Sequence, residues 1–289
     1  MKRIIRLTGF VCICSFLLPG VMQAQEDEDQ PIRPPFETIS LIDNQTTVSP
    51  FKGSMNLEIQ HRFSQIQEIA DLFGIYGSAN TRLALAYGVT DRIMVGFGTT
   101  RDYKLQDLEW KYSIFTQTRS GSIPVSLSYY GNAVLDARGS ENFGPEENYR
   151  FIHRLSYLTQ LIASRNFGGI VSVQVAPTFV YHNAVPEGYR NANASVNVGA
   201  RLQVLGLNSI ILEYDQPILQ PQDEPEYDIA GEQIYPNIAA GIEIGTSTHA
   251  FRIFVSNYNA IIKNRSIAFN SNNPLDGDFQ FGFNISVRF

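Results

Sequence analysis

Cysteine is almost absent from this 289-residue chain, and its two cysteines, Cys12 and Cys14, both lie within the first 25 residues. Residues 25–289 therefore offer no thiolate for a metal site, a disulfide scaffold or a cysteine nucleophile. Long apolar runs are also missing after residue 25, and a membrane-spanning helix needs about 20 such residues. The sequence thus excludes a disulfide-rich domain and a helical membrane protein.

The first 24 residues have the three parts of a secretory signal peptide. Lys2, Arg3 and Arg6 form a charged start, an apolar stretch covers residues 7–18, and Ala24 offers a cleavage point. A lipoprotein signal at either cysteine is a weaker alternative, because it would leave a very short apolar region. We therefore expect residues 1–24 to be removed as a signal peptide.

Basic residues are scarce in the remaining chain. Cleavage removes three of the 22 Lys+Arg and none of the 28 Asp+Glu, so 19 remain against 28, a net charge of −9. Nucleic-acid binding needs a basic surface, and no nucleic-acid partner is expected. Residues 25–52 are acidic and then punctuated by proline, without periodicity, which predicts a solvated periplasmic lead-in to a domain at 53–289.

Alternation of apolar and polar residues starts after residue 53 and recurs in twelve segments. Period two is the period of a β-strand, whose successive side chains point to opposite faces. The clearest example is the last segment, GDFQFGFNISVRF at 277–289. The segments predict strands near residues 55–63, 82–89, 93–98, 108–114, 125–129, 150–161, 171–179, 196–204, 210–214, 238–244, 251–255 and 279–289.

The connections between these segments alternate in length. Short ones lie at 88–92, 116–122, 164–169, 205–208 and 245–248, and those at 64–78, 101–107, 137–148, 183–190, 216–233 and 259–277 are as long or longer. Short periplasmic turns and longer extracellular loops are typical of outer-membrane barrels. We therefore predict an all-β fold, a transmembrane antiparallel up-and-down β-barrel of about 12 strands (range 10–14). A soluble β-sandwich is the alternative.

The last strand also resembles the signal by which outer-membrane barrels are recognised for assembly. Its large apolar residues are Phe279, Phe281, Phe283, Ile285, Val287 and Phe289. The expected location is the outer membrane of a Gram-negative cell, reached after signal-peptide cleavage. The expected partners are the barrel-assembly machinery, outer-membrane lipid and lipopolysaccharide, and the sequence does not indicate an oligomeric state.

Short motifs throughout the chain resemble an uncharacterised family of Bacteroidetes barrel proteins, DUF5777. They are FET at 36–38, IQHRF at 59–63, YGVTDR at 87–92, SY at 156–157, HNAVP at 182–186, LDGD at 275–278 and FGFNIS at 281–286. The resemblance implies a membrane-bound β-barrel and brings no activity with it.

The sequence offers little for catalysis or metal binding. The four histidines, His61, His153, His182 and His249, have no spacing that places two on one turn. We find no G-x-S-x-G and no serine in phase beside an outward-facing histidine, so neither an enzyme nor a cofactor is expected. Acidic loop residues predict either a solvated loop or sites for calcium and lipopolysaccharide-bridged cations: Asp223, Glu224, Glu226, Asp228, Asp276 and Asp278.

Charged residues of both signs fall on the polar, lumen-facing phase of the predicted strands. Eight are basic and five acidic: Arg62, Arg82, Arg150, Arg154, Lys111, Arg201, Arg252 and Arg288, with Glu58, Glu109, Glu213, Asp215 and Glu243. The basic surplus predicts a narrow channel for small polar solutes with a preference for anions, with Arg150 and Arg154 at its mouth. The alternative is a non-conducting barrel with a salt-bridged lumen that anchors partners, and a lipid-modifying enzyme is the third.

Overall fold

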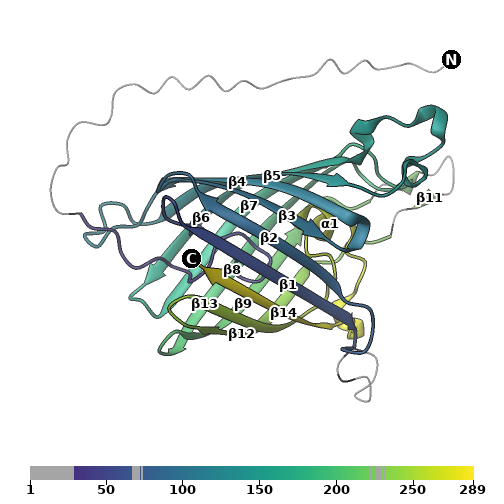
Figure 1. Cartoon of the computed structure of the whole chain (residues 1–289). Coiled ribbons are helices and arrows are strands. Elements are labelled where there is room, and N and C mark those ends of the chain that lie inside the picture. The colour runs from purple at the N-terminus through teal and green to yellow at the C-terminus, as the bar shows by residue number, and fades with distance from the viewer. Residues whose placement is uncertain (1–28, 67–71, 73, 222, 225–228, 231) are drawn as a thin grey trace, which may run out of the picture.

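Twelve antiparallel strands close into one barrel in the computed structural model, which describes residues 29–66, 72, 74–221, 223–224, 229–230 and 232–289 (Figure 1). The strands are β1 Met55–Gln65, β2 Asn80–Gly88, β3 Ile93–Thr100, β4 Leu105–Phe115, β5 Ser126–Asp136, β6 Leu155–Phe167, β7 Val171–His182, β8 Ala192–Leu205, β9 Asn208–Pro217, β12 Asn237–Gly245, β13 His249–Ser256 and β14 Gln280–Arg288. Each strand pairs with its neighbours along the chain, and β1 pairs with β14 to close the barrel. The predicted twelve-stranded up-and-down barrel is confirmed.

The barrel is apolar outside and polar inside. The outward positions of β9 are exposed and carry Ile210, Leu212 and Tyr214, whereas its inward positions Glu213 and Asp215 are buried. The same alternation runs around the wall, as expected when one face meets lipid and the other faces a lumen. None of the described helices is long and apolar enough to cross a membrane.

The connections gather at two ends, which we call the turn end and the loop end. The turn end carries 89–92, 116–125, 168–170, 206–207 and 246–248. The loop end carries 101–104, 137–154, 183–191 and 257–279, together with the described residues of the connections from β1 to β2 and from β9 to β12. The predicted alternation in length fails at the turn-end connection 116–125, which is longer than the loop-end connections 101–104 and 183–191. Leu105 pairs with Thr100, so β4 starts earlier than predicted, and the left-handed residues Tyr103 and Lys104 close a tight turn.

Residues 36–48 form a hairpin inside the barrel, which we call the N-terminal hairpin. The chain crosses the turn end, where the Ile32 amide donates to the Gln117 carbonyl, then enters the lumen and returns to the same end before β1 (Figure 1). Every residue from 38 to 46 is buried. The predicted solvated lead-in is therefore wrong for this stretch, because wall side chains supply the partners that water would otherwise supply.

A short helix enters the lumen from the opposite, loop end. Helix α1, Lys263–Phe269, belongs to the long connection between β13 and β14 and contacts β6, β7, β8 and β9. Ile267 packs against Leu158, Ile162 and Val180 of the inner wall. The N-terminal hairpin and α1 thus fill the barrel from its two ends.

Two glycines of β3 give room to charged side chains of the inner wall. A Cβ on Gly96 would lie 2.6 Å from Glu109 Oε1, and one on Gly98 would lie 2.6 Å from Asp107 Oδ1. Both glycines face inward, and a Cβ on Gly98 would also lie 2.7 Å from Arg82 Nε of the neighbouring strand. The two glycines therefore make space for buried charged side chains.

Arginine on the outer face should destabilise the barrel according to its depth. Leu212 lies at the middle of β9 and is 49% exposed. If it lies near the bilayer midplane, Leu212→Arg should lower the free energy of unfolding by about 2–4 kcal/mol. Ile218 lies just past the loop end of β9 and is 59% exposed. Ile218→Arg should lower the free energy of unfolding by only about 0–1 kcal/mol. Equilibrium unfolding in lipid vesicles measures both, and equal costs would contradict a lipid-facing wall.

Candidate functional site: the filled lumen and the loop-end chamber

The tip of the N-terminal hairpin holds a carboxylate of the wall. The Leu41 amide donates to the Asn44 carbonyl at 2.8 Å, which closes a tight turn. The three amides of Ile42, Asp43 and Asn44 then point at Glu213 Oε1, at 2.6, 3.0 and 2.9 Å. Successive amides of a turn form an anion-binding concavity. Here the anion is the protein's own carboxylate from β9.

Two arginines of the wall, Arg252 of β13 and Arg62 of β1, also hold the hairpin. Arg252 donates to the carbonyls of Ser40 and Leu41 at 2.6 and 2.9 Å and pairs with Glu58 at 2.6 Å. Arg62 pairs with Asp43 of the hairpin at 2.5 Å. Because all these groups are buried, each charge depends on its partner for the stabilisation that water no longer supplies.

Helix α1 meets the hairpin tip through the acidic pair of β9. Lys263 of α1 forms an ion pair with Asp215 and lies 3.6 Å from Glu213. Asp215 also accepts a hydrogen bond from Asn44 Nδ2 at 2.7 Å. The hairpin and the helix therefore share one acidic centre, and the two fillings are linked across the middle of the lumen.

Two further clusters anchor the hairpin closer to the turn end. Arg201 pairs with Glu243 at 3.0 Å and with Glu37 of the hairpin at 3.3 Å. Lys111 donates to the carbonyls of Ile39 and Val48 at 3.2 and 2.7 Å. These contacts join β4 and β8 to both legs of the hairpin.

Arg82 belongs to a cluster of the wall itself. It pairs with Asp107 at 2.5 Å and lies 3.7 Å from Glu109, and it donates to Gln60 Oε1 at 3.0 Å. Glu109 accepts a hydrogen bond from Tyr130 at 2.8 Å. The charges therefore satisfy one another around the inner surface rather than line an empty passage.

Most of the predicted lumen residues lie inside the barrel, Arg288 lies in the inward phase at its turn end, and Arg150 and Arg154 do not follow the prediction. The buried ones are Arg62, Arg82, Lys111, Arg201, Arg252, Glu58, Glu109, Glu213, Asp215 and Glu243. Arg288 is partly exposed near the turn end and reaches the Glu37 carbonyl at 3.0 Å. Arg150 and Arg154 precede β6 instead of lying in it. The Arg150 amide donates to His153 Nδ1 at 3.2 Å, and the His153 amide donates to the Arg150 carbonyl at 2.9 Å, so these residues form a short 3-10 turn.

Sequence reasoning missed four charged residues that complete the network: Glu37, Asp43, Asp107 and Lys263. Three of them lie outside the strands, where no alternation marks them as inward. Sequence reasoning also missed Asp136, which faces inward at the end of β5, and the basic surplus predicted for the lumen therefore disappears. Among the described strand residues, six inward charges are basic (Arg62, Arg82, Lys111, Arg201, Arg252 and Arg288) and seven are acidic (Glu58, Asp107, Glu109, Asp136, Glu213, Asp215 and Glu243).

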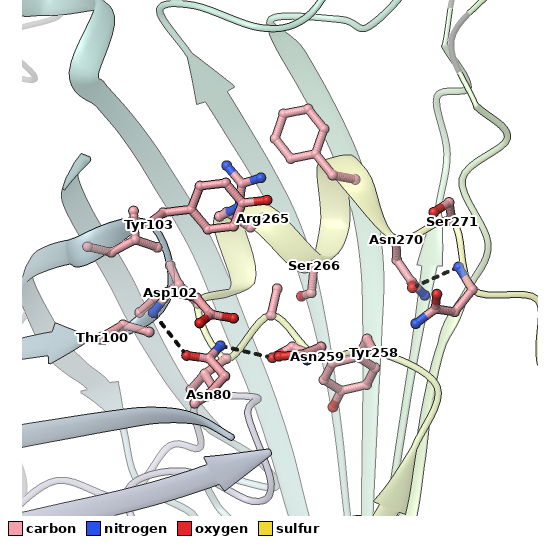
Figure 2. A pocket seen from close by; sticks show the side chains of 16 residues that line it. Asn80, Thr100, Asp102, Tyr103, Tyr258, Asn259, Arg265, Ser266, Asn270 and Ser271 are labelled. Atoms are coloured by element: carbon pink, nitrogen blue, oxygen red, sulfur yellow. Dashed lines mark hydrogen bonds between the residues drawn. The ribbon is translucent and has the colours of Figure 1, made fainter. Parts of the chain in front are cut away.

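Two cavities flank α1 at the loop end. One, of about 290 Å³, lies between α1 and the ends of β2 to β4, and its residues include Asn80, Asp102 and Tyr103 (Figure 2). The other, of about 510 Å³, lies under the 137–154 loop, and we call it the loop-end chamber. Arg265 of α1 lines both, and Figure 2 shows it against the ring of Tyr103. Burial lowers the pKa of the Arg265 guanidinium, and the charge of Arg138 adds to this.

The histidines do not converge. His61 lies on β1, His153 in the 137–154 loop, His182 at the loop end of β7 and His249 at the turn end of β13. In the part of the chain that the structure describes, no three His, Cys, Asp or Glu side chains gather as a metal site would require. Of the acidic loop residues, Asp276 and Asp278 are hydrogen-bonded to the Asn273 side chain and amide, and Glu226 and Asp228 lie outside the described residues.

A family model for a membrane bound beta barrel domain, DUF5777, matches residues 36–289. The chain belongs to this family. The match starts at the first residue of the N-terminal hairpin, so the hairpin is part of the family's domain rather than a separate leader. This confirms the resemblance inferred from the short motifs. No curated protein matches the chain in sequence.

Solved structures share the fold at very low sequence identity. The NanC porin has a TM-score of 0.51 and 8% identity, over 81% of this chain and 98% of that one. An outer membrane channel from Pseudomonas putida F1 has a TM-score of 0.48 and 10% identity, over 84% and 97%. Outer membrane phospholipase A from Escherichia coli has a TM-score of 0.39 and 14% identity, over 86% and 97%. The likeness to the porin shows a porin-like fold.

Proposed function

We propose that this protein is an outer-membrane channel for small polar solutes and that its own N-terminal hairpin closes it. The observation that carries the proposal is the path of the hairpin, which enters and leaves the lumen at the turn end. Ile32 bonds Gln117 on the way in, and Lys52 and Gly53 bond Asp91 and Gly88 on the way out. A segment with both ends on one side can withdraw without being threaded through the barrel.

The polarity of the wall supports a lumen that can hold water. The inward positions of β1 are Asn56, Glu58, Gln60 and Arg62, and the other strands continue this pattern. When the hairpin leaves, water can replace its hydrogen bonds to these groups, so the net loss per bond is only about 0.5–1.5 kcal/mol.

The second candidate is a non-conducting barrel that anchors partners or displays its loops. The buried ion pairs between the wall and the fillings favour it, because removing one partner of a buried pair is costly. The two candidates differ in one measurable property. In the channel the hairpin leaves the lumen, and in the anchor it stays.

A disulfide between hairpin and wall should lock the channel closed. Thr47 Oγ1 and Ser164 Oγ lie 2.6 Å apart, so the sulfur atoms of cysteines at these two positions would lie close to the roughly 2.0 Å S–S distance of a disulfide. Residues 25–289 contain no other cysteine. In planar bilayers, Thr47→Cys/Ser164→Cys should show no openings when oxidised and wild-type openings after reduction. Each single cysteine variant should behave like the wild type throughout.

The reduced protein provides the decisive outcome. Openings that appear only on reduction support a mobile hairpin. Openings in the oxidised protein would mean that ions pass without hairpin movement. A wild type that never opens at any voltage would favour the non-conducting barrel.

A further inference from the structure

The loop-end chamber contains more positive charge than its own carboxylates neutralise. Arg138, Arg154 and Arg265 line it, and Asp136 is its one lining carboxylate among the described residues. Asp136 is occupied by Arg138, with a 2.7 Å ion pair and a second contact of 3.0 Å from Arg138 Nε. No described carboxylate lies within ion-pair distance of Arg154 or Arg265. The chamber therefore carries an excess of two guanidinium charges.

Aromatic rings hold these arginines by their faces. The Tyr103 ring lies between Arg265 and Arg138, whose guanidinium carbons are 3.5 and 4.4 Å from its centre. The Phe143 ring is likewise contacted by Arg138 and Arg154, at 5.9 and 5.1 Å. A guanidinium that stacks by its face keeps its in-plane N–H donors for a planar anion. The rings therefore position the arginines without neutralising them. Arg154 also donates from Nε to Tyr149 Oη and from Nη1 to the carbonyls of Asp136 and Arg138, so its Nη2 group is what it offers to an anion.

The backbone at Tyr103 is in an uncommon conformation. Tyr103 and Lys104 both have left-handed φ angles, 59° and 49°, which residues with a Cβ rarely adopt. Such residues cluster at functional sites when the surroundings hold them in place. Here the turn places the Tyr103 ring between two arginines at the edge of both loop-end cavities.

His182 is a buried polar side chain without a partner at the same chamber. It lines the cavity at the end of β7, is 7% exposed, and packs edge-on against Phe269 at 5.0 Å. Neither of its ring nitrogens has a hydrogen-bond partner among the described residues. A buried polar group of this kind normally has one. A ligand in the chamber would supply it.

We propose that the loop-end chamber binds a small organic anion whose carboxylate or phosphate group is held by Arg265 and Arg154, with His182 as a further hydrogen-bond partner. A volume of about 510 Å³ suits a molecule of monosaccharide size, and the aromatic rings offer contact to its apolar body. The site goes beyond the proposed channel function, because it exists with the hairpin in place. The anion preference expected of the whole lumen thus belongs to this chamber.

Calorimetric titration of the folded chain 25–289 in detergent tests the site. The probes are D-glucuronate, glucose 6-phosphate and uncharged glucose, so that the two charged probes separate carboxylate from phosphate recognition. At least one charged probe should bind and glucose should not. Arg265→Gln and His182→Ala should each weaken binding by about tenfold to a hundredfold, the range of a charge-assisted hydrogen bond. Arg265→Lys keeps the positive charge and should therefore lose less binding affinity than Arg265→Gln.

Arg92→Gln is the matched control, because Arg92 is an exposed arginine at the turn end. It should leave binding unchanged. Circular dichroism of each variant establishes that the barrel is folded. The proposal is overturned if neither charged probe binds, if Arg265→Gln binds like the wild type, or if Arg92→Gln loses as much as Arg265→Gln. None of these measurements needs an open pore, so they are independent of the conductance of the barrel.

Discussion

A chain that starts at Pro50 should form an open pore. Truncation there removes the N-terminal hairpin and leaves all twelve strands, since β1 starts at Met55. The charges that held the hairpin, such as Arg252 and Lys111, then face water, which enters because the wall is polar. At the loop end the lumen is filled by α1, but two cavities flank it. In planar bilayers we expect a sustained current where chain 25–289 shows a closed baseline with brief openings.

A peptide with the sequence of residues 29–49 provides the control for this experiment. Added on the turn-end side, it should restore the block, because its partners in the wall are unchanged. The same peptide added on the loop-end side, or a scrambled peptide on either side, should have no effect. A truncated barrel that folds but carries no current would mean that α1 closes it alone, and the hairpin would not be the gate.

The strands could be predicted because lipid and lumen impose opposite polarity on alternate residues. Tyr157 and Leu161 face outward and Ser156 and Gln160 inward, as their alternation indicates. This alternation depends only on neighbouring residues, so it can be detected in a single sequence. It fails at Arg150 and Arg154, where alternation continues by chance through a 3-10 turn whose hydrogen bonds are internal.

The hairpin could not be predicted in the same way because its partners lie far away in the sequence. Ile42, Asp43 and Asn44 bond Glu213, about 170 positions further along the chain. Irregular backbone held by distant side chains leaves no periodicity to read. The available signal was indirect. The prediction placed eight basic and only five acidic residues in the lumen. Because buried charges need partners, this imbalance indicated that further acidic groups must lie inside the barrel.

Removing the Glu213 carboxylate should release the hairpin locally. Glu213→Ala leaves three amides of the hairpin tip without their acceptor and Lys263 with one carboxylate fewer. Breaking a buried pair from one side costs about 3–5 kcal/mol. Because the barrel wall keeps its own ladders, the cost should fall on the docking of the hairpin and not on the whole fold.

Hydrogen exchange read by mass spectrometry resolves this difference. Peptides that cover residues 37–48 should exchange about a hundredfold to several thousandfold faster in Glu213→Ala, which corresponds to the same 3–5 kcal/mol. Peptides from β7, Val171–His182, should keep their wild-type rates. In Glu213→Gln, residues 37–48 should exchange faster than in the wild type and more slowly than in Glu213→Ala. The glutamine amide oxygen still accepts hydrogen bonds from the hairpin tip, but the negative charge is gone.

Glu187→Ala is the matched control, because Glu187 is exposed in the loop between β7 and β8. Glu187→Ala should change the free energy of hairpin opening, measured by exchange of residues 37–48, by no more than about 0.5 kcal/mol. If Glu213→Ala accelerates exchange in β7 as much as in the hairpin, the hairpin is part of one cooperative unit with the wall. It could then not withdraw alone, and the same result would count against the proposed gate. If exchange in the hairpin is unchanged, the three amides have another acceptor and Glu213 does not hold the tip.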